Sequence, residues 1–390
     1  MDAAAESAVL TQRANRADAG AQVAGIAARD FRSYERVRVE LGQHLTVIVG
    51  PNGVGKTNLL EAIYCGCTGR SCRAAHEREI VRFGASSTRV EVSVLATDGP
   101  HQLSIAFAPG EPKRVSIDGA PVDNLIEAAV RPLMTVFLPD RLELVKGPPA
   151  VRRAHLDQLV AALWPARVAT RRAYAQTLAQ RNALIARIRN GGSSREALGA
   201  WDLKLALHAI DLMCDRAMAV DALSGSFVRL AGELGLEGEL EIGYRPRSRA
   251  ESAEQLTAEL ATRTESDLER GFTGHGPHRD ELALLRNGRE LRVYGSQGQQ
   301  RLALLSLLLA EREAIGQQRG ALPVALLDDV MSELDQDRRR ALTRLLRSHG
   351  GQAVITASEA DHVPGATAAN TTVVAVSREG AVERYAPLQA

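Results

Sequence analysis

The sequence predicts a mixed α/β fold into which a long helical lobe is inserted. Short apolar runs, several of them rich in β-branched residues, alternate with helical segments at both ends of the chain, as a parallel sheet covered by helices requires. From about residue 148 to 234 the hydrophobic spacing changes to the period of amphipathic helices. A glycine-rich loop near residue 50 joins an expected strand to an expected helix, and such loops bind phosphate groups.

Composition excludes several classes of protein. The 390 residues suffice for two to three domains, and 45% hydrophobic with 24% charged residues is typical of globular chains rather than fibres or disordered segments. The 48 basic and 47 acidic residues leave a net charge of +1, so any affinity for nucleic acid must come from a local patch. The longest strongly apolar run, 302–310, is too short to cross a bilayer. We expect a cytoplasmic protein with no membrane partner.

The N-terminal third is expected to form strands around one helix. Residues 1–21 are rich in alanine with scattered charges, which predicts a flexible extension. The run at 45–49 is uniformly apolar, as in a strand buried on both faces of a sheet, and a helix should follow over 56–67. Alternating runs joined by Asp-Gly turn signals predict an antiparallel layer beside this sheet. The other expected strands are 23–27, 37–41, 88–96, 102–107, 114–117 and 134–138.

The rest of the chain is expected to be helical first and mixed afterwards. Gly191–Ser194 should divide the helical region into two antiparallel limbs, and Pro165 should kink or break the first of them. The further expected elements are strands at 239–244, 282–286, 324–327, 353–356 and 373–376, and helices at 253–269, from 296 onward and at 338–346. We therefore predict a strand-rich domain from 22–146 with 272–390, and an inserted, mostly helical lobe at 147–271.

The most informative segment matches the pattern G-x-x-x-x-G-K-[ST]. It consists of Gly50, Pro51, Asn52, Gly53, Val54, Gly55, Lys56 and Thr57, and we call it the phosphate loop. The glycines allow the backbone N–H groups to point at phosphate oxygens, Lys56 can neutralise β- and γ-phosphate charge, and Thr57 can bind Mg²⁺. A chance glycine-rich turn is the alternative, but the strand before and the helix after the loop favour ATP with Mg²⁺.

A second carboxylate-bearing segment lies far along the chain. The apolar strand expected at 324–327 ends in Asp328 and Asp329, as a Walker B segment does. Asp328 can hold Mg²⁺, and Asp329 can orient or deprotonate an attacking water, so Asp329 and Lys56 are the expected catalytic residues. The alternative is that the two aspartates only cap a helix or turn.

A third segment begins the helix expected from residue 296. Ser296, Gln297, Gly298 and Gln299 offer a hydroxyl and small residues at a helix N-terminus, where an anion can bind. Taken alone, this segment fits a well-capped helix equally well.

Together these segments resemble the RecF family of bacterial recombination mediators, within the ABC and SMC-like ATPases. The resemblance runs from about residue 24 to 385 and is carried by 30–34, 50–64, 69–73, 144–147, 276–280, 294–301 and 327–335. It implies an ABC-type ATPase head, in which a mixed sheet with the phosphate loop lies beside an antiparallel layer. It also implies a head-to-tail homodimer that holds ATP between the phosphate loop of one copy and the helix of Ser296–Gln299 of the other, and it makes Asp335 a further nucleotide-binding residue.

The resemblance further implies a function in replication and recombinational repair. Members bind duplex DNA near single-strand gaps without sequence preference, and act with RecR and RecO to load RecA and to induce the SOS response. ATP serves as a switch, with weak, DNA-stimulated hydrolysis. Arginines of the helical lobe, at 152, 153, 167, 171, 172, 181, 187 and 189, are read either as a phosphate-binding stripe or as a solvated face.

Three departures from the wider ABC pattern bear on mechanism. Asp329 stands where many relatives have glutamate, Ala357–Ser358 stands where ABC transporters have a switch histidine, and Asp140–Arg141 stands at the usual Gln-loop position. The alternative function, a nucleotide-binding subunit of an ABC transporter, predicts a Leu-Ser-Gly-Gly-Gln signature that the chain lacks. His275 and His278 are flanked by glycine and proline rather than placed on the helix that a zinc H-E-x-x-H site needs, which favours a loop or catalytic-surface role.

Overall fold

Two compact units make up the chain in the computed structural model: residues 1–140 with 315–390, and residues 141–314. The structure describes residues 20–125, 128–348, 350–377 and 382–385. The extension predicted at 1–21 lies almost wholly outside these residues. The domain boundaries predicted above, at 146/147 and 271/272, stay a prediction about the ATPase head and its insertion.

The first unit contains the predicted parallel sheet. Its strand order is β15-β14-β3-β13-β12-β8. The strands are β3 (Leu45–Val49), β8 (Met134–Phe137), β12 (Val324–Leu327), β13 (Ala353–Ala357), β14 (Thr371–Val376) and β15 (Val382–Tyr385), of which β15 alone pairs antiparallel. The carboxyl ends of β3, β12 and β13 therefore meet at one edge, where ligands bind in sheets of this kind.

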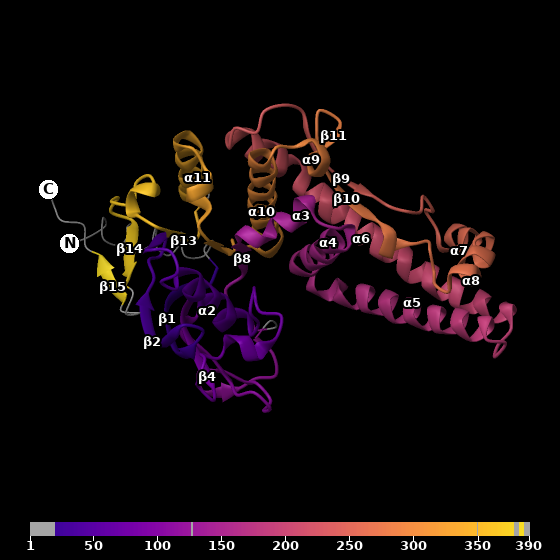
Figure 1. The fold of residues 1–390 in the computed structure, drawn as a ribbon, viewed down its shortest axis with the longest axis horizontal. Helices are drawn as coiled ribbons and strands as arrows, with labels where there is room; N and C mark the ends of the chain where they lie inside the picture. Colours follow the sequence, from indigo (N-terminus) through magenta and orange to yellow (C-terminus); the bar gives the residue numbers. More distant parts are fainter. Residues whose placement is uncertain (1–19, 126–127, 349, 378–381, 386–390) are drawn as a thin grey trace, which may run out of the picture. The chain divides into compact units, whose positions relative to one another are not determined.

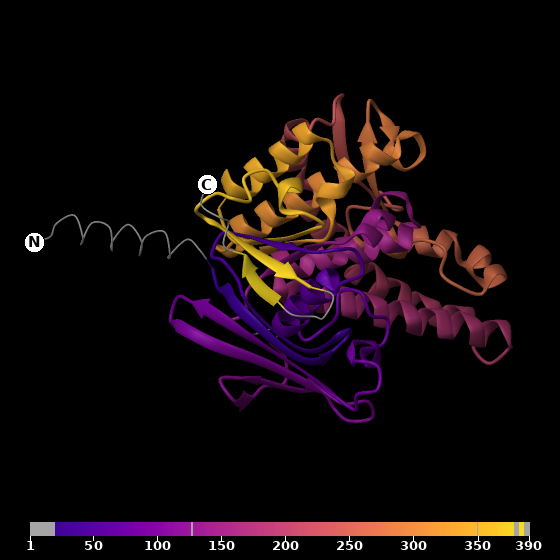
Figure 2. The same ribbon diagram turned by 60° about the vertical axis from the view of Figure 1, so that its left-hand side comes forward.

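An antiparallel sheet forms the second layer of this unit. Its order is β2-β1-β4-β5-β6-β7. The strands are β1 (Gln22–Phe31), β2 (Tyr34–Glu40), β4 (Thr88–Ala96), β5 (Gly99–Phe107), β6 (Arg114–Ile117) and β7 (Ala120–Pro121), and Figure 2 shows them, in indigo to purple, as a curved layer. Helix α2 (Lys56–Thr68) contacts strands of both sheets. Its Leu59 and Ile63 share a buried core with Val92 of β4 and Leu326 of β12, so the helix after the phosphate loop is fixed between the layers.

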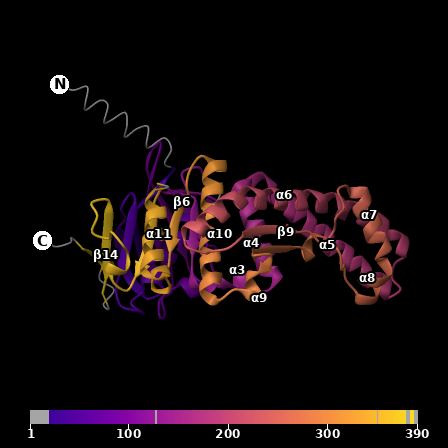
Figure 3. The same cartoon turned by 90° about the horizontal axis from the view of Figure 1, so that it is seen from above.

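The second unit is built on long helices. Helices α4 (Pro149–Leu163) and α5 (Val168–Arg189) form the first predicted limb, which breaks at Pro165 as expected. Helix α6 (Leu198–Glu233) is the second limb, and it packs along α5 (Figures 1 and 3). Gly191, with φ of 73°, turns the chain between the limbs. The buried residues Tyr174, Leu205 and Leu212 belong to the core of this lobe.

The helix predicted over 253–269 is two helices. Helix α7 (Ala253–Thr262) ends and α8 (Thr264–Arg270) begins at Arg263. The Thr262 hydroxyl and the Arg263 guanidinium both donate to the Glu259 carbonyl, at 2.8 and 3.1 Å. The Arg263 backbone N–H donates to the Leu260 carbonyl rather than to the Glu259 carbonyl that a continuous helix would use. Side chains thus occupy the carbonyl that would continue the helix, which explains the break.

A small sheet completes the second unit. It has the order β11-β10-β9, from β9 (Leu240–Arg245), β10 (Glu281–Arg286) and β11 (Arg289–Glu290). The predicted turn at Asn287–Gly288 is confirmed, and both residues have positive φ, at 51° and 70°. The remaining helices of this unit are α3 (Glu143–Lys146), α9 (Leu291–Tyr294) and most of α10 (Gln297–Arg319). Helix α11 (Gln336–Ser348) belongs to the first unit. Across the described residues, no helix combines the length and apolarity that a membrane span needs.

Candidate nucleotide-binding site

The phosphate loop lies between β3 and α2, as predicted. Gly50, Gly53 and Gly55 have φ of 156°, 80° and 113°. A Cβ atom at Gly50 would lie 2.5 Å from the Val376 carbonyl oxygen, and one at Gly55 would lie 2.8 Å from the Tyr34 hydroxyl. Neither position can hold a side chain without displacing backbone or a buried ring. The tight curl of the loop therefore depends on its glycines.

Lys56 is held inside the loop. Its side chain is largely buried, and Nζ donates to the carbonyl oxygens of Gly50 at 2.6 Å and Pro51 at 3.0 Å. Burial lowers the pKa of Lys56, while the nearby Asp329 and Asp328 carboxylates act in the opposite direction and raise it. Among the residues that the structure describes, the ammonium has only these neutral backbone acceptors at hydrogen-bond distance. It is thus well placed to exchange them for the oxygens of an anionic ligand.

A chain of hydrogen bonds joins the start of α2 to the ends of β12 and β13. The Thr57 hydroxyl donates to the Asp328 carboxylate, at 2.8 and 3.0 Å from its two oxygens. The Thr356 hydroxyl donates to Asp328 Oδ1 at 2.8 Å and accepts from the Asp329 N–H at 2.8 Å. Hydroxyl and carboxylate oxygens are the donors that Mg²⁺ takes, so Thr57 and Asp328 fit a magnesium site. Thr356, which sequence reasoning missed, sets the position of both aspartates.

Asp329 has a left-handed backbone. Its φ is 48° and its ψ is 25°, immediately before the short turn Val330–Glu333. Aspartate tolerates this region better than most residues, but it is sparsely populated and such positions concentrate at functional sites. The hydrogen bond from its N–H to buried Thr356 holds the backbone there.

A buried glutamate on α2 ties together three of the segments that carry the family resemblance. Glu61 is fully buried and accepts from Arg32 at 2.9 and 2.7 Å. Ser71 donates to the same carboxylate, and Arg73 lies 3.8 Å from it. Sequence reasoning missed this cluster. A charged residue in the middle of an otherwise buried helical stripe was the available signal.

Three of the other predicted nucleotide residues, Ser296, Gln299 and Asp335, cap helices. Ser296 and Gln299 cap α10 reciprocally: the Ser296 N–H donates to Gln299 Oε1 at 2.9 Å, and the Gln299 N–H donates to Ser296 Oγ at 3.3 Å. Ser296, Gln297 and Gly298 are exposed. They belong to the second compact unit, whereas the phosphate loop belongs to the first. Asp335 caps α11 by accepting from the Arg338 N–H at 2.9 Å.

Most arginines of the helical lobe are already paired. The partners are Glu281 for Arg152, the Asp280 carbonyl for Arg153, Asp215 for Arg167, Asp157 for Arg171, and Asp202 with Asp267 for Arg181. Arg172, Arg187 and Arg189 are exposed. Neither interpretation made above fits the whole set, because acids that the spacing does not reveal neutralise half of these eight charges.

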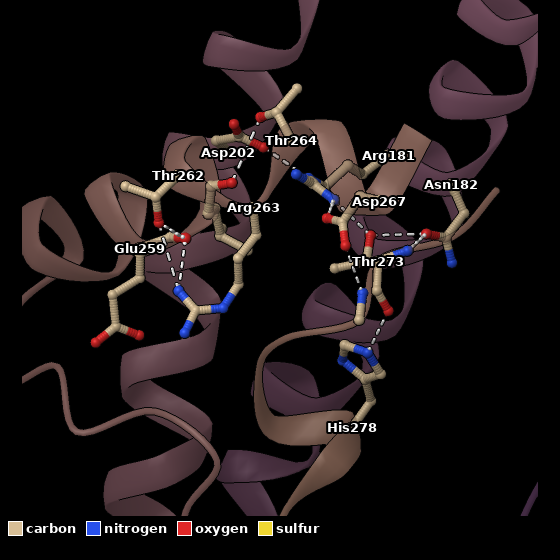
Figure 4. A network of polar contacts seen from close by, with 12 residues as sticks. Arg181, Asn182, Asp202, Glu259, Thr262, Arg263, Thr264, Asp267, Thr273 and His278 are labelled. Atoms are coloured by element: carbon tan, nitrogen blue, oxygen red, sulfur yellow. Dashed lines mark hydrogen bonds and ion pairs between the residues drawn. The ribbon is translucent and has the colours of Figure 1, made fainter. Parts of the chain in front are cut away.

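The histidines at 275 and 278 belong to a polar network inside this lobe, part of which Figure 4 shows. His278 Nε2 lies 2.9 Å from the Thr273 carbonyl, which can only accept, so Nε2 carries the proton and the Tyr174 hydroxyl donates to Nδ1 at 2.7 Å. Burial lowers the pKa of His278 to about 4. His275 Nε2 lies 2.5 Å from Glu259. The predicted loop position is confirmed, but the contacts of both rings are internal.

Ala357 and Ser358 stand at the end of β13, where ABC transporters have a switch histidine. Ser358 Oγ lies 3.1 Å from Nδ1 of His362, which sits in the turn Ala360–His362. The structure thus brings the later histidine back beside the end of the strand.

Comparison with known proteins agrees with this geometry. Residues 22–382 match the RecF/RecN/SMC N terminal domain family. The DNA replication and repair protein RecF of Heliobacterium modesticaldum is 36% identical over 86% of this chain and 92% of its own length, and that of Myxococcus xanthus is 35% identical over 88% and 92%. A solved structure of the recombination mediator RecF with ATPrS has a TM-score of 0.81 at 29% identity, covering 94% of this chain and 99% of that one.

A more distant structure supports the fold alone. An SMC head bound to the C-terminal winged-helix domain of ScpA has a TM-score of 0.57 at 16% identity, over 93% of this chain and 96% of that one. The predicted ABC and SMC-like head is thereby confirmed. The chain belongs to the RecF family of DNA replication and repair proteins.

Proposed function

We propose that this chain binds ATP with Mg²⁺ at the phosphate loop, and that ATP switches it into a head-to-tail homodimer that binds duplex DNA. The observation that carries the proposal is the hydrogen-bonded chain from Thr57 through Asp328 to Thr356, which joins the phosphate loop to the Walker B aspartates. Solved RecF structures whose titles name ATP and ATPrS support the choice of nucleotide.

Each candidate site residue of the first unit has its own role in this proposal. Backbone N–H groups of Gly50–Gly55 and the Lys56 ammonium bind the phosphates, while Thr57 and Asp328 hold Mg²⁺. The metal, when bound, neutralises phosphate charge and aligns the terminal phosphoryl group. Asp329 orients or deprotonates the attacking water. Its short side chain fits weak hydrolysis, since it reaches less far than the glutamate of many relatives.

The second half of the site comes from the partner copy. In this proposal Ser296, Gln297, Gly298 and Gln299 meet the γ-phosphate, and Asp335 lies at the same junction. The exposure of Ser296–Gly298 supports the proposal, since these groups have no cover in the monomer. ADP lacks the γ-phosphate, so only ATP stabilises the closed dimer.

The biological setting follows from family membership. We place the chain in the cytoplasm, at duplex DNA next to single-strand gaps, where it acts with RecR and RecO to load RecA and promote SOS induction. The RecFOR pathway named for the solved relative supports this assignment.

Size-exclusion chromatography of the full chain tests the switch. We expect a shift from monomer to dimer with ATP, stronger with gapped duplex DNA, and no shift with ADP. Ser296→Arg should abolish the shift while the monomer still binds ATP, because arginine blocks the contact with the partner copy. Ser194→Arg, at an exposed serine of the lobe, is the matched control. A wild-type chain that stays monomeric with ATP and DNA would refute the proposal.

A further inference from the structure

Arginines form a row across the exposed face of the antiparallel sheet. Arg29 of β1 pairs directly opposite Arg36 of β2 on one side and Arg89 of β4 on the other. Arg89 pairs with Ala106 of β5, which pairs in turn with Arg114 of β6. All four arginines are exposed, whereas their strand neighbours Val37, Ala28 and Val90 are buried toward α2 and the core. The pairing therefore places four positive charges in one line over five strands.

The next row adds one more arginine and one acid. Arg38 pairs opposite Ala27, which pairs with Glu91. The side chains of Arg36 and Arg38 have no hydrogen-bond or ion-pair partner among the residues that the structure describes. Arg29, Arg89 and Arg114 pair only with acids close in sequence, at 3.5, 2.8 and 3.1 Å, and stay 67, 60 and 80% exposed. The two rows therefore carry a clear excess of positive charge.

This arrangement does not serve the stability of the sheet. Like charges directly opposite one another on neighbouring strands are destabilising, and the row repeats this pairing twice, at Arg36 with Arg29 and at Arg29 with Arg89. The same face is hollowed by about 430 Å³, and the hollow is lined by four arginines and one acid, with the small Ala27 between them: Arg29, Arg36, Arg38, Arg89 and Glu91. A small residue between long arginines leaves room for an anion to approach the strands.

We propose that this face binds the phosphate backbone of duplex DNA. With strands about 4.8 Å apart, the row from Arg36 to Arg114 extends roughly 19 Å, which exceeds the ~12 Å width of a major groove, so its ends can reach both DNA strands. Guanidinium groups match phosphates well, and contacts with phosphates carry no sequence information. Binding is therefore independent of sequence and sensitive to salt. This proposal rests on the proposed function and names the surface that carries its DNA contact.

The test compares two double variants of the full chain. Arg36→Ser with Arg38→Ser removes two charges that have no partner in the described structure, so no acid is left unpaired. Arg340→Ser with Arg344→Ser removes two exposed arginines from α11 in the same unit and is the matched control. A short fluorescent duplex of mixed sequence is titrated with each protein in ATP and Mg²⁺, between about 50 and 200 mM salt. ATP affinity and dimerisation are measured in parallel.

We expect the Arg36 and Arg38 variant to bind the duplex on the order of tenfold more weakly, with the slope of log K against log salt reduced by roughly 2. Its ATP affinity and its ATP-dependent dimerisation without DNA should equal those of the wild type. Its thermal stability should not fall below that of the wild type, because Arg36 lies opposite the like charge of Arg29. The control should match the wild type in all of these properties. Equal duplex binding by variant and wild type would overturn the surface assignment alone. Loss in the α11 control instead, or displacement of the duplex by poly-glutamate at equal charge, would also overturn it. Failure of the wild type to bind duplex at all would refute the proposed function itself.

Discussion

Buried charge is used in opposite ways in the two compact units. At the phosphate loop, the Lys56 ammonium hydrogen-bonds only to backbone carbonyls, and the Asp328 carboxylate only to hydroxyl groups. In the lobe, the fully buried Arg181 guanidinium lies between Asp202 and Asp267, at 2.6 and 2.7 Å. The first arrangement leaves charge available to a ligand, and the second neutralises it internally. These charged residues thus divide into a candidate binding site and a structural scaffold.

The largest effect should follow from removing the available charge. Lys56→Met should weaken ATP binding by about 100-fold to 10,000-fold, because in the proposed complex the ammonium would make charge-assisted hydrogen bonds of roughly 1.5–3 kcal/mol each to two phosphates. Calorimetric titration with ATP measures this loss. Lys204→Met, at an exposed lysine of α6, should leave ATP affinity unchanged. An ATP affinity equal to that of the wild type in the Lys56 variant would show that the Lys56 charge is not available to the nucleotide, in contradiction to the comparison above.

Removing the neutralised charge should act on stability instead. Arg181→Met leaves Asp202 and Asp267 buried without a cation, which should lower the free energy of unfolding by about 3–5 kcal/mol. Chemical denaturation measures this loss. Arg187→Met, exposed on the same helix, is the control and should change stability by less than about 0.5 kcal/mol. A small loss in the Arg181 variant would show that its carboxylate partners are not structural.

The lobe should also lose stability in acid through His278. Its pKa is lowered from 6.5 to about 4, chiefly by burial, so the unfolded chain gains a proton at a pH where the folded chain does not. The contribution of His278 is complete above pH 6.5, declines as pH falls toward about 4, and is constant below it. The loss should reach about 3 kcal/mol. Chemical denaturation at several pH values in this range measures the free energy of unfolding, which should depend less on pH in His278→Gln than in the wild type. An equal dependence on pH in the two proteins would contradict the assignment.

The smallest effect should follow from removing the Thr356 hydroxyl, which positions the two aspartates. Thr356→Val removes a hydroxyl that bonds both Asp328 and the Asp329 N–H, and should cost about 1 kcal/mol of stability and weaken Mg²⁺-dependent ATP binding several-fold. Thr343→Val removes a buried hydroxyl of α11 that bonds only the Arg339 carbonyl. It should cost similar stability with no change in ATP affinity. Equal ATP affinities in the two variants would show that Thr356 does not position Asp328 and Asp329 for nucleotide binding.

Local patterns predicted the site better than the scaffold. The phosphate loop and the strand before Asp328 are encoded in contiguous residues, so motif and periodicity suffice to find them. Thr356 reaches Asp328 only because β13 pairs beside β12, a neighbour relation that no single segment reveals. The arginines of the lobe look alike in sequence, yet Arg181 is fully buried and Arg187 is exposed, because helix packing decides which of them meets an acid. The break at Arg263 likewise depends on side-chain bonds to one carbonyl.

The strand order has a consequence for synthesis on the ribosome. Strand β3 pairs only with β13 and β14, so the strand that ends in the phosphate loop has no neighbour until residue 353 and beyond have been made. At about 5–20 residues per second, the apolar β3 segment waits roughly 15–60 s for its neighbours. The second unit, residues 141–314, is continuous in sequence and can fold meanwhile. The unpaired β3 segment is thus open to aggregation with other chains during this interval.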